Sequence, residues 1–208
     1  MYLPAHFRED RPERLEAFVA AHPLGALVVA TPHGLEANHI PMLLSRDAAG
    51  RSVLRGHVAR ANELWRRAAE GPPALVIFGG AQRYITPSWY PSKRVTGEVV
   101  PTWNYAVVHA HGPIRFIHDH DWLLALVSTL TELNERPRAA PWSVTDAPAA
   151  YLERMLRAIV GFEIAVERLE GKFKASQNRT AEDRAGVAAG LAADGVDAAE
   201  RDELVRAS

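Results

Sequence analysis

The chain has 208 residues, 48% of them hydrophobic and 24% charged, a composition typical of one sizeable folded domain and too apolar for intrinsic disorder. Lys and Arg (24) nearly balance Asp and Glu (25), and the formal net charge of -1 excludes a strongly basic nucleic-acid or membrane-surface protein. Because Cys is absent, disulfides, Cys-ligated metals, cysteine nucleophiles and thioether-linked cofactors are excluded. The polar start and the lack of an apolar run of roughly 18 residues predict a cytoplasmic protein.

The N-terminal third predicts one helix followed by short strands. Asp10 can cap the helix, Pro12 suits its first turn, and His22-Pro23 ends it. Its apolar face holds Leu15, Phe18 and Val19. Three strands are then expected at 25–31, 35–44 and 52–58, with turns at 32–34 and 47–50.

The middle of the chain predicts further strands around one short helix. The helix covers 61–69, with Leu64 and Trp65 facing inward. A strand at 74–78, of the kind buried on both faces, precedes Gly79-Gly80 and a second strand at 82–86. Prolines make 87–97 a loop, and 99–117 is one long strand or two broken near Gly112-Pro113.

The C-terminal third is mainly helical. Leucines at 3.6-residue spacing predict a helix around 123–133, and a second helix is expected at 149–158. Alternation over 162–167 predicts a half-solvated strand whose outer positions include Glu163. The tail, 181–207, predicts two helices hinged at Gly195. The fold class is α+β, mainly β: a small antiparallel β-barrel with peripheral helices and a C-terminal helical tail.

The first candidate site is the strand-to-helix corner at 55–62 (RGHVARAN). A helix start exposes unpaired N–H groups that attract phosphate. His57 and Arg60 can add charge-assisted bonds, and Asn62 adds a neutral donor. The alternative is a helix cap with solvated polar side chains.

An aromatic loop, 84–93, is the second candidate. Trp89 and Tyr90 offer flat faces to a planar ring and Lys93 offers a cation. The same aromatics could instead plug one end of a barrel.

The third candidate is the strand at 100–112. Trp103, Tyr105 and Val107 share one face, and Thr102, Asn104 and Ala106 the other, which suits contact with a ring or with a second subunit. A metal site is an alternative, because four histidines occur nearby: His109, His111, His118 and His120. Solvated histidines on a strand edge are commoner, so we predict no metal.

The fourth candidate is 172–179 (KFKASQNR), which crowds cations and amides before the tail helix. It predicts either capping by Ser176, Asn178 or Thr180, or polar recognition of a heteroaromatic edge. Hydrolase and nucleoside triphosphatase motifs are absent from the sequence, and no catalytic residue is assigned.

These segments together resemble the PaiB-type family of FMN-binding negative transcriptional regulators. The resemblance runs in unbroken order over nearly the whole chain, with small departures at Glu63 and Ala175. The matching segments are 1–7 (MYLPAHF), 38–44 (NHIPMLL), 56–62 (GHVARAN), 87–93 (PSWYPSK), 100–105 (VPTWNY) and 176–179 (SQNR).

The resemblance implies a single split β-barrel domain over 1–208, with the barrel in 1–180 and the tail in 181–208. It implies a homodimer that holds FMN in two clefts at the subunit interface. The phosphate would be held by Arg55, His57, Val58, Ala59, Arg60 and Asn62. The ring would be lined by Trp103, Asn104 and Tyr105 and by Gln177, Asn178 and Arg179, the last three from this chain or its partner, with Lys93 a weaker candidate for either end.

The function implied by the resemblance is gene regulation by an FMN-binding homodimer. We expect an indirect route, since the charge balance and the lack of an evident helix-turn-helix make direct DNA binding doubtful. The alternatives are an NAD(P)H-dependent flavin reductase or oxidoreductase, a haem-binding or haem-degrading split-barrel protein, and a storage or scaffold dimer with a structural flavin.

Overall fold

The computed structural model describes residues 1–68 and 71–205. The chain divides into two compact units, each described by itself below. The terminal unit contains Met1–His22, Phe78–His109 and Leu169–Ser208, and the central unit contains Pro23–Ile77 and Ala110–Arg168. No helix in the described ranges is long and apolar enough to cross a membrane.

Two long strands contribute to both units, and the remaining elements are short. The long strands are β6 (Pro73–Ile85) and β7 (Thr102–Ile117). The terminal unit adds η1 (Ala5–Phe7), β1 (Arg8–Glu9), α1 (Pro12–Ala21), η2 (Pro87–Trp89), η3 (Pro91–Arg94), nearly all of β9 (Arg168–Lys174), α5 (Ala181–Ala193) and α6 (Ala198–Val205). The central unit adds β2 (Leu24–Thr31), β3 (Gly34–Pro41), β4 (Leu43–Arg46), β5 (Ser52–Ala59), α2 (Leu64–Arg67), α3 (His120–Glu135), η4 (Val144–Asp146), α4 (Ala149–Arg157) and β8 (Ile159–Ala165).

The strands pair in the order β3-β2-β6-β7-β8-β5-β4, and β9 pairs with both β1 and β7. The registered pairs are antiparallel: β5, for example, pairs with β4 on one side and with β8 on the other. The hairpin of β2 and β3 closes at Thr31 and Gly34, where the φ of +113° favours glycine. Fold class is therefore as predicted, a mainly antiparallel β structure with peripheral helices.

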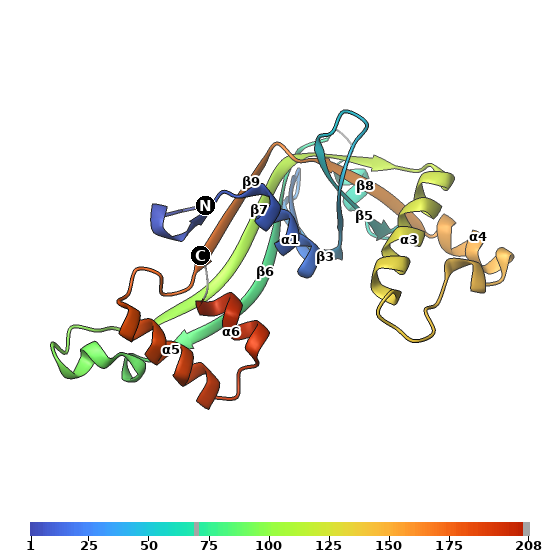
Figure 1. Ribbon diagram of the computed structural model, residues 1–208. Coiled ribbons are helices and arrows are strands. Elements are labelled where there is room, and N and C mark those ends of the chain that lie inside the picture. Colours follow the sequence, from blue (N-terminus) through green and yellow to red (C-terminus); the bar gives the residue numbers. More distant parts are fainter. Residues whose placement is uncertain (69–70, 206–208) are drawn as a thin grey trace. The chain divides into compact units, whose positions relative to one another are not determined.

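The tail helices have a small core of their own with the aromatic loop. Ile85, Tyr90, Val187, Leu191 and Leu204 form one buried cluster, and Figure 1 shows α5 and α6 beside the ends of β6 and β7. A Cβ on Gly190 would lie 2.2 Å from Cδ2 of Trp89, so glycine lets the indole pack directly on α5. The tail is thus packed on the aromatic loop within the terminal unit through apolar burial.

Several predicted helices are confirmed, with boundaries that differ by up to three residues. The first helix runs Pro12–Ala21 and buries Leu15, Phe18 and Val19 as expected. The helices expected around 123–133 and 149–158 are α3 and α4. The tail bends at Gly195, whose φ is +79°, between two helices as predicted, and residues 206 and 207 of the predicted tail lie outside the described residues.

Two predicted elements have the wrong length. The strand expected at 35–44 is interrupted at Met42, whose N–H donates to the carbonyl of Pro23 at 2.9 Å, and the chain then changes partner from β2 to β5. The helix expected at 61–69 is only Leu64–Arg67, while Ala69 lies outside the described residues. Asn62 holds the preceding segment in a turn, because its side-chain oxygen accepts the N–H of Leu64.

Other corrections concern boundaries and burial. Residue Arg11, not Asp10, precedes the first helix without a side-chain cap. The strand predicted at 74–78 continues through the glycines to Ile85, and it alternates in burial instead of being buried on both faces. β7 begins at Thr102 instead of residue 99, and it is one unbroken strand through Gly112-Pro113, the first of the two predicted alternatives. The half-solvated strand is wrong: Glu163 on β8 is only 6% exposed, because it pairs with two arginines.

Candidate functional site

The predicted site residues divide between the two units. The corner residues Arg55 to Asn62 belong to the central unit. Lys93, the strand Trp103–Tyr105 and the turn Gln177–Arg179 belong to the terminal unit. Each group is therefore described within its own unit.

At the corner, Arg60 is committed to the protein. Its Nε donates to the carbonyl of Arg157 at 2.6 Å, and Nη2 donates to that of Ile159 at 2.8 Å. The remaining Nη1 lies 3.4 Å from Nδ1 of His118. The helix expected to offer free N–H groups here has only four residues, too short for an appreciable dipole.

The other corner residues are also engaged or turned inward. Arg55 donates to the carboxylate of Glu163 at 2.7 Å, and the side-chain amide of Asn62 donates to Asn38 at 2.7 Å. Val58 is in the core, whereas Ala59 is exposed. His57 is half-buried, Nδ1 has no partner among the described residues, and burial lowers its pKa, which favours the neutral imidazole.

Beside the corner lies a hollow of about 460 Å³ that the sequence did not predict. Trp65, Arg66, Arg115, Phe116 and His118 line it. The guanidinium carbon of Arg66 is 4.5 Å from the centre of the Trp65 ring. Arg115 is already paired with Glu163.

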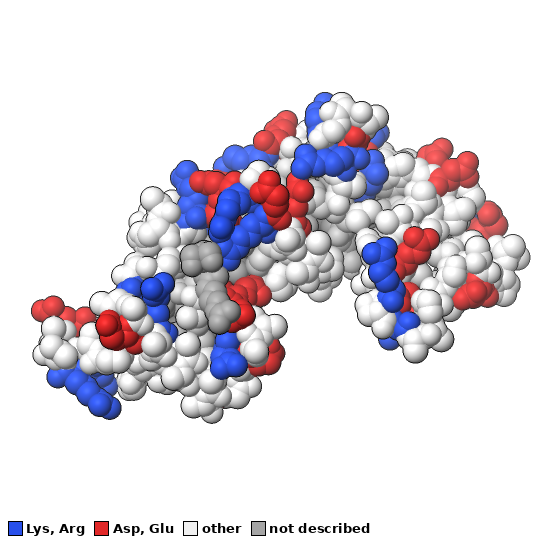
Figure 2. Space-filling model, in the orientation of Figure 1, with Lys and Arg blue, Asp and Glu red and all other residues white. Residues whose placement is uncertain are grey.

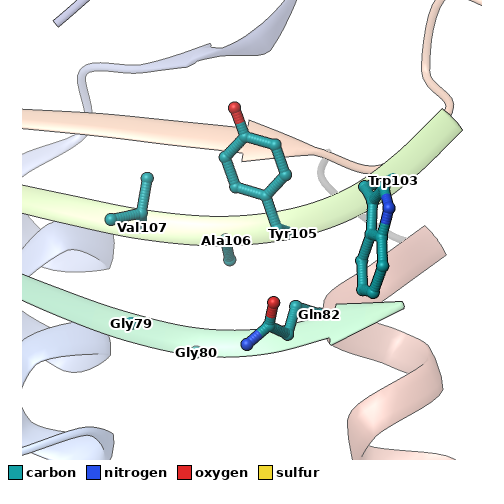
Figure 3. Close-up of a pocket in the computed structure, with 7 residues that line it drawn as sticks. All are labelled: Gly79, Gly80, Gln82, Trp103, Tyr105, Ala106 and Val107. Atoms are coloured by element: carbon teal, nitrogen blue, oxygen red, sulfur yellow. The ribbon is translucent and has the colours of Figure 1, made fainter. Parts of the chain in front are cut away.

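In the terminal unit, β6 and β7 form a groove of about 380 Å³ (Figure 3). The backbone of Gly79 and Gly80 forms one wall, and Tyr105 and Val107 project from the same side of β7. Trp103 and Gln82 complete the groove. As predicted, alternate residues of β7 face outward, and Trp103 is 52% exposed.

The same unit contains a smaller cavity of about 80 Å³, which we call the tail pocket. Among the residues lining it are Tyr90, Asn104, Lys174, Ser176, Asn178 and Arg179. Three of these, Asn104, Asn178 and Arg179, belong to the predicted set. The tail pocket thus joins parts of the second, third and fourth candidate segments.

Three of the predicted residues make hydrogen bonds within the protein. The buried amide of Asn104 donates to Ser176 at 2.9 Å and to the carbonyl of Leu204 at 3.0 Å. Gln177 folds onto its own turn, accepting the N–H of Ala175 at 2.7 Å. Lys93 is exposed, with Nζ 3.3 Å from Oγ of Ser88, and it lines neither cavity.

The sequence missed Gln82 and Lys174. Gln82 is an isolated polar residue after two glycines, and no pattern within β6 marks it. Lys174 lies in the fourth candidate segment, 172–179, but its hydrogen bonds to Thr102 and to the carbonyl of Trp103 depend on the pairing of β9 with β7. Long-range pairing of this kind carries no local sequence signal.

Comparison with known proteins gives a family match and full-length relatives. Residues 1–168 match the family model described as "Putative FMN-binding domain". An uncharacterized protein of Emericella nidulans is 35% identical, over 95% of this chain and 93% of its own length. The protease synthase and sporulation protein PAI 2 of Bacillus subtilis is 32% identical, over 88% of this chain and 85% of its own.

Solved structures share the fold at low identity. An FAD and heme binding protein from Mycobacterium smegmatis aligns with a TM-score of 0.60 and 19% identity, covering 81% of this chain and 73% of that one. The flavocytochrome Anf3 from Azotobacter vinelandii aligns with a TM-score of 0.56 and 15% identity, covering 86% and 75%. The likeness supports the split-barrel architecture expected from the sequence.

Proposed function

The chain belongs to the PaiB-type family of FMN-binding domains, and from this premise we propose that it is an FMN-binding homodimer that acts in gene regulation by an indirect route. The flavin is held without a covalent thioether, since the chain has no Cys. When bound, FMN supplies the redox chemistry, and the protein supplies binding and orientation.

The groove between β6 and β7 is the observation that carries this proposal. Its volume of about 380 Å³ is within the usual range for small-molecule sites, roughly 300–1,000 Å³. Tyr105 and Trp103 offer aromatic surface for stacking on an isoalloxazine, and Gly79 and Gly80 let a flat ring approach the backbone. The amide of Gln82 can both donate to and accept from the polar edge of the ring.

The phosphate end requires positive charge. A phosphate monoester carries about -1.5 to -2 charges at neutral pH, and micromolar binding amounts to about -8.2 kcal/mol. The corner residues Arg55, His57 and Arg60 remain the assignment implied by the family resemblance. Arg55 and Arg60 already use some of their donors on Glu163 and on main-chain carbonyls, so phosphate would be bound by the donors that remain.

Exposed apolar side chains of the terminal unit support the dimer. Tyr84, Val95, Val100 and Trp103 are 49%, 85%, 65% and 52% exposed. The rings of Tyr84 and Trp103 meet edge to face, with centres 6.3 Å apart. Apolar and aromatic surface of this kind is what a protein interface covers, and a second copy of the chain would bury it next to the groove.

An indirect regulatory route is supported by the distribution of charge. On the face that Figure 2 shows, basic and acidic side chains are interspersed, and the net charge is -1. DNA binding requires several phosphate contacts from Lys and Arg and falls steeply with salt. Tight, salt-dependent binding to a defined operator by the purified protein would contradict the indirect route.

The FMN proposal is tested by the absorbance spectrum of the protein as purified. We expect flavin bands, and the chromophore released by acid should be FMN by chromatography and mass. The apoprotein should regain those bands with FMN. A protein that is purified with a different chromophore, and that FMN does not displace, contradicts the assignment.

The flavin reductase alternative rests on the same cofactor. Stopped-flow mixing of the FMN-loaded protein with NADH or NADPH distinguishes a flavin reductase from a non-enzymatic FMN-binding regulator. Rapid bleaching supports an enzyme, and no reduction at millimolar nicotinamide supports a non-enzymatic role. An apoprotein as dimeric and heat-stable as the loaded protein would exclude a purely structural flavin.

Haem is the second candidate ligand, because the two structural neighbours above are haem-binding or a flavocytochrome by name. In this chain, burial favours the neutral form of His57 and leaves one ring nitrogen without a partner, and neutral imidazole is the form that ligates metals. A Soret band on adding haemin, lost in His57→Ala, would support this candidate.

A further inference from the structure

We propose that the tail pocket binds a phosphate group through Arg179, Lys174 and the hydroxyl of Tyr90. As a site for free phosphate, it is independent of the function proposed above. As the site of the FMN phosphate, it rests on that function and moves the phosphate from the corner at Arg55–Asn62 to the terminal unit.

Two cations line the pocket with donors to spare. The guanidinium of Arg179 makes no hydrogen bond within residues 1–68 and 71–205, and it lies with its central carbon 4.8 Å from the centre of the Tyr90 ring. Lys174 uses Nζ to bond Thr102 and the carbonyl of Trp103, which leaves one of its three donors. None of the described residues that line the pocket is a carboxylate. The charge of this pair is therefore uncompensated locally.

The positive charge of Arg179 also affects the pKa of Lys174. Burial lowers its pKa, and the charges of Lys172 and Arg179 lower it further. An anion bound between Lys174 and Arg179 would relieve this repulsion. The corner differs in this respect, because Arg55 and Arg115 already share the carboxylate of Glu163 there.

Tyr90 provides the independent sign of a ligand. Its side chain is 2% exposed, and the buried hydroxyl has no hydrogen-bond partner among the described residues. A buried hydroxyl without a partner is costly, and such groups in native proteins usually bond to something. Because Tyr90 lines the pocket, an oxyanion there can accept this hydrogen bond.

The turn that carries Arg179 is held in place by several bonds. Ser176 has a φ of +60°, a strained conformation for a residue with a side chain. Its hydroxyl is tied to buried Asn104, and its carbonyl accepts the N–H of Arg179 at 2.9 Å. Backbone strain held by buried bonds is typical of ligand-binding turns, and here it sets the position of Arg179.

The size of the pocket limits its occupant. A volume of about 80 Å³ is well below the roughly 300–1,000 Å³ usual for pockets that hold a whole small-molecule ligand. This accommodates a tetrahedral oxyanion but excludes a flavin ring. The occupant is therefore a free small anion or the phosphate end of a larger ligand whose remainder lies outside.

The test measures inorganic phosphate binding to the full chain by calorimetry, with chloride keeping the ionic strength constant. Arg179→Gln should weaken phosphate binding at least tenfold, and Tyr90→Phe roughly three- to tenfold. Arg94→Gln is the matched control, since Arg94 is exposed on η3 and lines no part of the pocket; we expect less than a twofold change. Tyr90→Phe should not lower the Tm of the phosphate-free protein, because it removes a hydroxyl without a partner.

FMN and riboflavin then identify the source of the phosphate. If it is that of FMN, Arg179→Gln weakens FMN but not riboflavin, and phosphate competes with FMN. If the natural ligand is free phosphate, Arg179→Gln weakens phosphate binding alone. The affinities of the variant for FMN and riboflavin then equal those of the wild type, or neither protein binds a flavin. The proposal is overturned if Arg179→Gln binds phosphate, FMN and riboflavin like the wild type, or if Arg94→Gln loses as much.

Discussion

Arg55 donates from Nε to the buried carboxylate of Glu163 across 2.7 Å. The bond connects neighbouring strands, since the two residues face each other in the register of β5 and β8. Arg115, from β7, reaches the other oxygen of the same carboxylate. A cation expected to bind phosphate is thus part of an ion cluster that joins three strands, β5, β7 and β8.

Glu163→Gln should destabilise the protein by about 1–3 kcal/mol, because two charge-assisted bonds are lost at a buried position. The measurement is urea unfolding at pH 7. Arg115→Gln is the control: its side chain is 71% exposed, and we expect a loss below about 1 kcal/mol. Equal losses would contradict the buried character of the cluster.

Arg60→Ala tests whether the FMN phosphate binds at the corner or in the tail pocket, by changing a corner residue. The carbonyls of Arg157 and Ile159 lose their donor, so we expect a loss of about 1 kcal/mol, or roughly 2–4 °C in Tm. If the phosphate is bound in the tail pocket, FMN and riboflavin affinities change by the same factor. A selective loss of FMN would place the phosphate at the corner.

Gly190→Ala should lower stability by about 1–3 kcal/mol through overpacking, although alanine is the better helix former. The new methyl group would lie 2.2 Å from the Trp89 ring. Thermal unfolding measures the loss. Adding Trp89→Ala should remove most of the penalty of Gly190→Ala in a double-mutant cycle. Additive effects of the two changes would show that α5 does not pack on the aromatic loop in this way.

The stability of the terminal unit should depend on Glu9 at acid pH. Hydrogen bonds from the side chain of Arg11, which lies 2.6 Å away at Nη2, hold the pKa of this buried carboxyl below its ordinary value. A lowered folded-state pKa stabilises the protein above the unfolded value, and the stabilisation is lost as pH falls through the folded value.

Glu9→Gln is therefore less stable than the wild type at pH 7, and the difference narrows as pH falls below about 4.3. The free energy of unfolding as a function of pH measures this. Glu13→Gln, at an exposed carboxylate of α1, should differ little from the wild type at either end of the range. A gap for Glu9→Gln that stays constant down to acid pH would rule out the ion pair as its cause.

Local patterns predicted the fold well where the physics is local. The periodic faces of α1 and α3 and the turn glycines at Gly34 and Gly50 are visible in the sequence, and they are where expected. The burial of Glu163 could not be seen, because alternation marks it as outward-facing and its partners come from two other strands.

The candidate site shows the same division. The outward face of Trp103 and Tyr105 follows from the period of a strand. The tail pocket does not, because it needs β9 beside β7 and the turn at Ser176 beside Asn104. The family resemblance predicted Asn104, Asn178 and Arg179 as site residues. The sequence also predicted phosphate binding at the start of a helix, but that helix, α2, has only four residues.

Titration of the apoprotein with FMN, followed by quenching of flavin fluorescence, tests the central claim most directly. We predict saturable binding of one FMN per chain with a Kd of about 1 μM or tighter, and elution of the complex at twice the mass of one chain in size-exclusion chromatography with light scattering. FMN fluorescence that stays unchanged at protein concentrations far above this Kd, from a chain that elutes as a monomer, would contradict the account.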